Sequence, residues 1–205
     1  MNALLTYTLR QGDRALVLAQ RLLEVITHAP EIEEDMALSN LALDLIGQAR
    51  ALYSYAGEVE GAGHDEDHFA YWREQHEFLH PLLGQIPNGD FSQVITRQLL
   101  HDAYALPDWQ AATRSSDATL AAIVGKSVKE TAYHLRHSRS WVLRLGDGTD
   151  ESHRRAQDAV DGLWRYTGEL FDTDEVEHEL IAAGVAADPT ALREQWRATV
   201  SATLA

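Results

Sequence analysis

Four carboxylates lie near the middle of four long stretches whose apolar residues recur at helical spacing. They are Asp13, Asp44, Asp102 and Glu130. Periodicity turns some of them toward an apolar interior, where an unpaired carboxylate is very costly. One inward carboxylate per helix is the arrangement of di-iron helix bundles, in which two of the helices also carry a histidine three residues after the glutamate. The carboxylates therefore raise the hypothesis of a di-metal site.

The histidines of such a site are missing at the required spacing. Gly47 stands three residues after Asp44 and has no ligand atom, and Tyr133 stands three residues after Glu130. A tyrosine is a weak substitute because its proton must first be lost. Three of the four carboxylates are also aspartates, one methylene group shorter than glutamate. We therefore predict neither a catalytic residue nor a bound metal in this chain, and we interpret six positions as those of a degenerate metal site: Asp13, Asp44, Gly47, Asp102, Glu130 and Tyr133.

A cation could replace the positive charge of the missing metal. Lys126 precedes Glu130 by one helical turn, so its ammonium can reach the same region. We expect a charge-compensating network in which His134 and Gln48, each four residues after a carboxylate, act as hydrogen-bond partners and not as ligands. The alternative is an exposed Lys126–Glu130 pair that contributes a few tenths of a kcal/mol, and the spacing favours neither.

The remaining candidates for chemistry are weaker. His76 and His80 are four residues apart in a stretch that we expect to be a short helix from about Phe69 to Leu83. Such a pair can bind zinc, but a solvated surface is the expectation here. Five tryptophans are spread over the helical stretches and are expected to pack in the core or in an interface: Trp72, Trp109, Trp141, Trp164 and Trp196.

The elements that must position these side chains are helices nearly throughout. Apolar periodicity without β-branched alternation predicts long helices over about residues 3–27, from Pro30 to 59, over 91–113 and over 118–145. Ser116 or Asp117 is expected to cap the fourth of them. Further helices are expected over 152–171, in the segment TDEVEHELIAAG, and from Pro189 onward. The prediction is a single all-α domain over residues 1–205, with a four-helix bundle at about 3–145 and additional helices at about 152–205.

Composition narrows the class of protein. The chain has 205 residues, no cysteine and a formal charge of −15. The missing cysteines exclude thiolate metal sites and disulfides, and the acidic balance argues against nucleic acid as a partner. The N-terminal sequence MNALLTYTLRQGDR lacks the pattern of a signal peptide. No stretch reaches the roughly 18 apolar residues of a membrane span, so we expect a soluble, cytoplasmic protein.

Several long strings closely resemble one family of proteins. They are YTLRQGDRALVLAQRL, NLALDLIGQAR, VKETAYHLRHSRSWVLRLGDGTD and LWRYTGELFD, and the similarity runs from about Leu5 to Ala205. The chain resembles the C subunits of bacterial phenylacetyl-CoA 1,2-epoxidases, which are multicomponent monooxygenases of phenylacetate degradation. The resemblance implies a ferritin-like structural subunit in a hetero-oligomer. The chain departs from the pattern of its relatives in one respect, because they usually continue for some forty residues beyond the point where it ends.

The resemblance also implies where the chemistry takes place. The di-iron centre is expected in a catalytic A subunit of the same fold, and NADPH is expected to be used by a separate reductase subunit. This chain would then bind no cofactor of its own. Two other classes stay open: a self-sufficient ferritin-like di-metal oxidase or metal-storage protein, and a helical interaction module unrelated to oxygenases.

Overall fold

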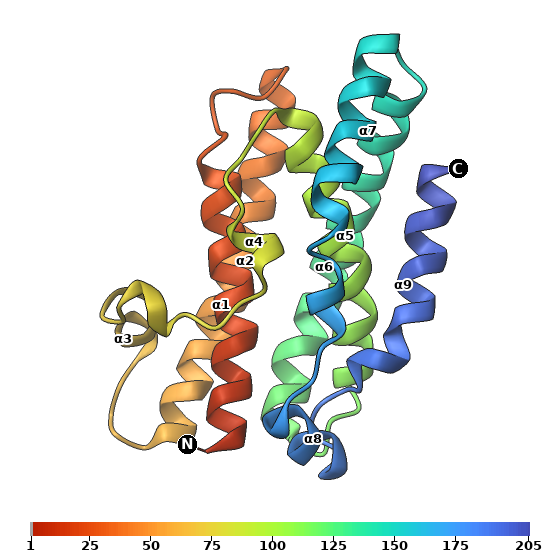
Figure 1. The fold of residues 1–205 in the computed structure, drawn as a ribbon. Coiled ribbons are helices and arrows are strands. Elements are labelled where there is room, and N and C mark those ends of the chain that lie inside the picture. Colours follow the sequence, from red (N-terminus) through yellow and green to blue (C-terminus); the bar gives the residue numbers. More distant parts are fainter. Residues whose placement is uncertain (1) are drawn as a thin grey trace.

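Four long helices form a ferritin-like bundle, as the sequence predicted. The computed structural model describes residues 2–205, and this part of the chain contains helices and no strand. The bundle helices are α1 (Ala3–Leu23), α2 (Ile32–Glu60), α5 (Phe91–Ala112) and α6 (Ala118–Gly146). α1 packs along α2 and α5 packs along α6, each pair joined by a short turn, and α2 contacts α6 across the bundle (Figure 1).

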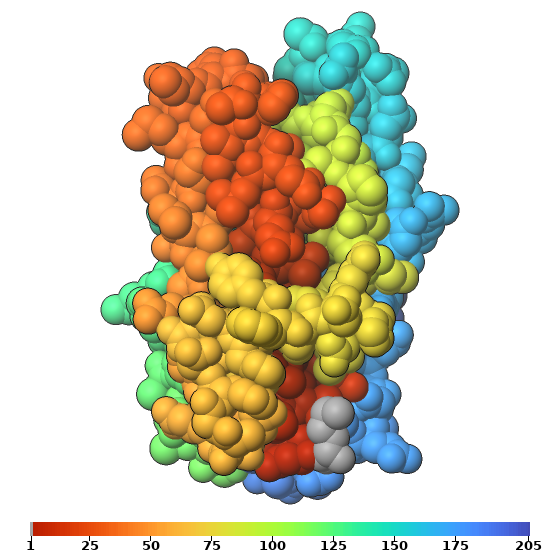
Figure 2. Space-filling model, turned by 90° about the vertical axis from the view of Figure 1, so that its left-hand side faces the viewer, coloured from red at the N-terminus to blue at the C-terminus, as the bar shows by residue number. Residues whose placement is uncertain are grey.

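One long connection joins the two helix pairs, as ferritin-like folds require. This crossover segment, residues 61–90, passes over α1 and packs between α1 and α5 (Figures 1 and 2). It contains only short helices: α3 (Glu66–Tyr71), η1 (Gln75–Glu77) and α4 (Leu82–Gln85).

The predicted helix from about Phe69 to Leu83 is therefore wrong. The backbone is extended at Glu74 and Phe78, and Arg73 Nε donates to the Phe69 carbonyl at 2.7 Å. The Leu79 N–H donates to Asp13 on α1 at 2.6 Å and not to a residue of its own segment. Contacts with α1 thus replace the hydrogen bonds that a continuous helix would have made.

The other helix boundaries follow the sequence more closely. α1 ends at Leu23, four residues before the predicted end, and a series of turns follows it. Asp117 is the N-cap of α6, because its carboxylate accepts a hydrogen bond from the Leu120 N–H at 2.8 Å. The predicted helix over 152–171 is divided into α7 (Asp150–Trp164) and the short η2 (Gly168–Phe171).

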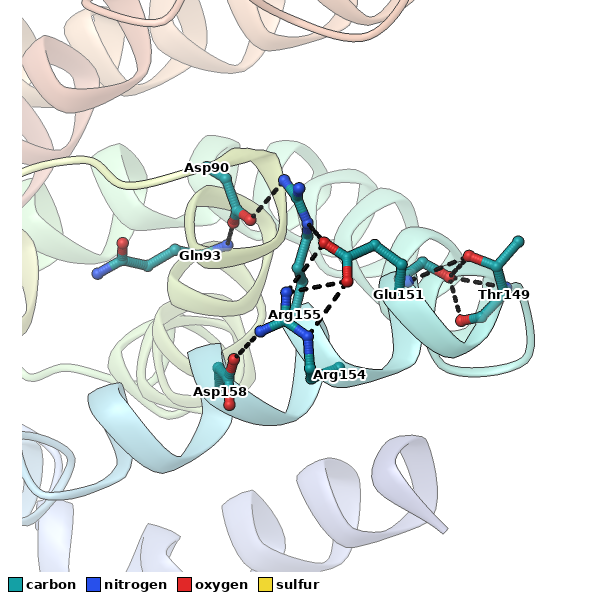
Figure 3. A network of polar contacts seen from close by, with 8 residues as sticks. Asp90, Gln93, Thr149, Glu151, Arg154, Arg155 and Asp158 are labelled. Carbon is teal, nitrogen blue, oxygen red and sulfur yellow. Dashed lines mark hydrogen bonds and ion pairs between the residues drawn. The ribbon is translucent and has the colours of Figure 1, made fainter.

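The last third of the chain packs around the bundle. α7 lies against α5 and α6, α8 (Glu175–Ala182) lies against α1, and α9 (Pro189–Leu204) lies against α5 and α6. An ion-pair network at one end joins α7 to the start of α5, where Arg155 contacts Asp90 at 3.3 Å and Glu151 at 2.7 Å (Figure 3). These side chains are about half exposed, so each pair contributes little stability.

A glycine in α1 permits a close approach to α2. Gly12 is buried, and a Cβ added there would lie 2.6 Å from Cε1 of Tyr53, whose ring is fixed by its hydroxyl contact with Asp13. Gly47 on α2 has no atom within 4 Å of the position of such a Cβ. The two glycines therefore have different roles, although both lie within long helices.

Replacing these glycines by alanine should have opposite effects. Gly12→Ala should lower the free energy of unfolding by about 1–3 kcal/mol because the methyl group overlaps Tyr53. Gly47→Ala should raise it by up to about 1 kcal/mol, since alanine favours the helix and meets no neighbour. Urea unfolding followed by circular dichroism measures both. Equal stability of the two variants would contradict the close contact at Gly12.

Candidate functional site

The four carboxylates of the predicted degenerate site do not converge on one point. Within residues 2–205, no three His, Asp or Glu side chains are placed so as to hold a metal ion together. Asp13 and Asp102 are fully buried, whereas Asp44 and Glu130 face the line along which α2 meets α6. Each of the four carboxylates has its own partners within the protein.

Asp13 binds the crossover segment to α1. One oxygen accepts a hydrogen bond from the Tyr53 hydroxyl at 2.6 Å, and the other accepts the Leu79 N–H. The guanidinium of Arg73 contacts both oxygens, at 3.0 Å to Oδ2 and more closely to Oδ1. The Arg73 side chain is only 10% exposed, and it also lies over the ring of Phe78. A buried carboxylate with this many donors is fully compensated without a metal.

Asp102 is compensated in another way. Its Oδ1 accepts a hydrogen bond from Gln98 Nε2 at 2.8 Å and lies 3.2 Å from His101 Nδ1. Burial raises the pKa of Asp102 well above its usual range, and burial together with the charge of Arg14 lowers the pKa of His101 well below its own. Both shifts favour the uncharged forms. Both shifts therefore oppose an ion pair between Asp102 and His101.

A row of polar pairs crosses the line between α2 and α6, which we call the α2–α6 seam. Asp44 Oδ2 lies 3.1 Å from His134 Nε2, and Gln48 Nε2 donates to Glu130 at 3.0 Å. His134 is fully buried, and burial lowers its pKa although Asp44 opposes this shift. The neutral imidazole thus donates to the carboxylate, and the expectation that His134 and Gln48 act as hydrogen-bond partners agrees with this geometry.

The two positions that lack histidines open to the outside of the bundle. Gly47 and Tyr133 are both exposed, and the ring of Tyr133 stacks on His137, which contacts Glu34 at 2.9 Å. The interior-facing arrangement expected from periodicity is wrong for this part of the molecule. α2 and α6 pack closely, so residues at their junction point outward beside it and not toward α1 and α5.

The predicted role of Lys126 is also wrong. Its side chain is 80% exposed, and its ammonium lies 3.9 Å from the Glu130 carboxylate. The ion pair is therefore the exposed alternative, which contributes a few tenths of a kcal/mol at most. Gln48, not Lys126, provides the close partner of Glu130, because an amide can enter the seam without the desolvation penalty of an ammonium.

The sequence did not predict the buried ion pair between α1 and α5. Arg14 Nη2 contacts Asp108 at 3.0 Å, both side chains are almost completely buried, and the guanidinium lies 4.8 Å from the ring centre of Trp109. Arg14 lines a cavity of about 410 Å³, which the ion pair of Arg10 and Glu177 also lines. Arg14 and Asp108 each stand among apolar residues in the sequence, which indicates burial. Their pairing could not be predicted, because it depends on how α1 and α5, which are far apart in the sequence, are placed along each other.

The other sequence candidates have these positions. His76 is exposed and His80 half-buried, and because η1 ends at Glu77 they do not lie on one helix. Trp109 and Trp196 are in the core, Trp141 is half-buried, and Trp72 and Trp164 are exposed.

None of the helices within residues 2–205 is both long and apolar enough to cross a lipid bilayer.

Removing the Asp13 carboxylate should destabilise the fold strongly. Asp13→Asn leaves the buried Arg73 guanidinium without its counter-ion, so the free energy of unfolding should fall by about 3–5 kcal/mol. Lys126→Met is the matched control, because it removes an exposed charge and should change stability by less than about 0.5 kcal/mol. Urea unfolding of the purified chain measures both. A larger effect at Lys126 than at Asp13 would refute this assignment.

Asp102 should make the stability depend on pH. The folded chain keeps the Asp102 proton above the ordinary pKa of 3.8, whereas the unfolded chain loses it, so the contribution of this group to stability falls as pH rises above that value. Asp102→Asn stays neutral, and its stability relative to the parent should rise with pH by up to about 1.4 kcal/mol per unit. Unfolding curves from pH 4 to pH 8 test this. A constant difference over that range would show that the pKa of Asp102 is not raised.

Sequence comparisons agree with the resemblance. Residues 1–205 match the family described as Phenylacetic acid catabolic protein. The chain is 50% identical over 202 residues to the C subunit of the 1,2-phenylacetyl-CoA epoxidase of Escherichia coli (strain K12), an alignment that covers 98% of this chain and 81% of that protein. A match over the whole chain and this identity show membership: the chain belongs to the family of phenylacetic acid catabolic proteins.

Proposed function

We propose that this chain is a non-catalytic structural subunit of a phenylacetyl-CoA 1,2-epoxidase, where it pairs with a catalytic A subunit of the same fold and stabilises it. The relative in Escherichia coli is the C subunit of such an enzyme. The observation that carries the proposal is that three of the four carboxylates are held by protein side chains. Asp13 is held by Arg73 and Tyr53, and Asp44 and Glu130 are held by His134 and Gln48.

A di-iron centre does not fit these residues. Both oxygens of Asp13 already accept hydrogen bonds from donors that a metal would have to displace. Gly47 offers no ligand atom, and Tyr133 lies on the outside of the bundle. Iron chemistry is therefore assigned to the partner and not to this chain. In this proposal the A subunit holds the di-iron centre, a reductase subunit uses NADPH, and the complex acts in the cytoplasm.

The structural role gives this chain a defined physical task. The buried charge of Asp13 is satisfied by protein groups, so this part of the bundle is held together without a cofactor. Such a bundle can present a surface to its partner without binding a metal of its own. The competing function, a self-sufficient ferritin-like oxidase or store, requires metal bound by this chain itself.

Metal content and substitution should separate the two functions. The chain purified without chelators should contain far less than one iron per molecule. In the complex with the A subunit, Asp44→Asn and Glu130→Gln should lower the yield of assembled complex and leave turnover per iron-loaded complex within about threefold of the parent, because neither residue contacts reacting atoms. Plasma emission spectrometry gives the iron content and oxygen consumption with phenylacetyl-CoA gives the turnover.

Two results would overturn the structural role. About two tightly bound irons per isolated chain would favour the oxidase or storage function. Complete loss of turnover in a fully assembled, iron-loaded Glu130→Gln complex would place this residue in the active site.

A further inference from the structure

The outer side of α2 carries two large apolar side chains that are exposed. Met36 and Leu43 are 63% and 62% exposed, and Gly47 lies on the same side. Between Met36 and Ala56 the helix carries only two charged residues, Asp44 and Arg50. Asn40 is exposed between Met36 and Leu43, and Glu33 and Arg50 are exposed at the two ends of this side, so its apolar part is a short patch. An exposed apolar patch on a soluble protein often marks an interaction site. α1 and α6 cover only the inner sides of α2, so its outer side is accessible to a further binding partner.

The outer side of the neighbouring α6 is basic. Lys126, Lys129 and Arg136 are exposed on it, and Tyr133 beside them is 43% exposed. Neither Lys129 nor Arg136 takes part in an ion pair within residues 2–205, and Arg136 lies over the ring of Tyr133, 5.3 Å from its centre. On a chain with a formal charge of −15, two neighbouring cations without an acidic partner are unexpected.

The acids nearest to these cations are engaged in the seam. Glu34 contacts His137, Asp44 contacts His134, and Glu130 accepts from Gln48. Each carboxylate therefore has a partner between the helices, while the ammonium and guanidinium groups remain outside. The result is a short apolar patch on α2 with a cationic border on α6.

We propose that this surface docks the metal-binding partner subunit, through an area of that partner that is apolar at its centre and acidic at its rim. We call the surface the α2–α6 docking face and define it by Met36, Leu43, Gly47, Lys129, Tyr133 and Arg136. The inference rests on the proposed pairing and specifies where it occurs. α2 and α6 lie together on the far side of the molecule in Figure 1, opposite the crossover segment, which leaves this face open.

A second copy of this chain fits the docking face less well. A two-fold dimer through this face would place Lys129 and Arg136 of one copy against the same face of the other. That face offers them Arg50, carboxylates that already contact His134, His137 and Gln48, and one exposed carboxylate, Glu33. Two cations would share this one carboxylate while losing water, which is costly. An acidic rim on a different protein removes this cost and also accelerates association.

Two variants and two controls test the docking face. Leu43→Glu introduces a charge into the apolar centre of the docking face, and the double variant Lys129→Glu/Arg136→Glu reverses the charge of its border. Leu82→Glu is the control for the first, since Leu82 is 46% exposed on the opposite side, and Arg165→Glu/Arg197→Glu is the control for the second. Binding of the full chain to the purified A subunit is measured by interferometry at low and high salt, and melting curves confirm that each variant is folded.

Both docking-face variants should raise the dissociation constant by about tenfold or more, and both controls should stay within twofold of the parent. The charge variant should also bind with a weaker dependence on salt. If the parent binds the A subunit and the docking-face variants bind equally well, the docking face is wrong and the proposed pairing stands. If the parent does not bind the A subunit, both fail. If Leu43→Glu abolishes only self-association, the face belongs to a homodimer and the inference is overturned.

Discussion

An unpaired carboxylate in a low-dielectric interior costs several kcal/mol, and the structure depends on how this cost is avoided at the centre of each long helix. Three different solutions occur. Asp13 is neutralised by a guanidinium that the crossover segment brings to it. Asp102 is favoured in its protonated form by burial. Asp44 and Glu130 lie in a seam where they keep partial access to water and receive donors from the facing helix.

These solutions also decide the shape of the molecule. The Asp13–Arg73 contact fixes the crossover segment against α1 and prevents a regular helix there, as the bond to the Leu79 N–H shows. The seam brings α2 and α6 close together, while large side chains such as Arg14 and Trp109 fill the space between α1 and α5. Polar contacts thus set both the route of the connection and the spacing of the helix pairs.

The sequence predicted the helices well because their information is local. Apolar periodicity and caps such as Asp117 locate the four long helices within a few residues. The prediction from sequence was wrong for features that depend on contacts between residues far apart in the chain. The crossover segment is extended because Asp13 binds it, and the environments of Lys126 and Tyr133 depend on the rotation of α6 about its axis, which spacing along one helix does not specify. The absence of histidines at 47 and 133 was readable from spacing alone, whereas the new partners of the carboxylates were not.

The attachment of Asp13 to the crossover segment has a consequence for any attempt to engineer a metal centre into this fold. Introducing histidine at positions 47 and 133 would supply the missing imidazoles, but at positions that open to the outside of the bundle. A metal would also have to take Asp13 from Arg73, and the released guanidinium would remain buried beside Phe78. The Asp13 carboxylate thus holds a connection of thirty residues against α1. A rebuilt metal centre would first require another contact that holds this connection between the two helix pairs.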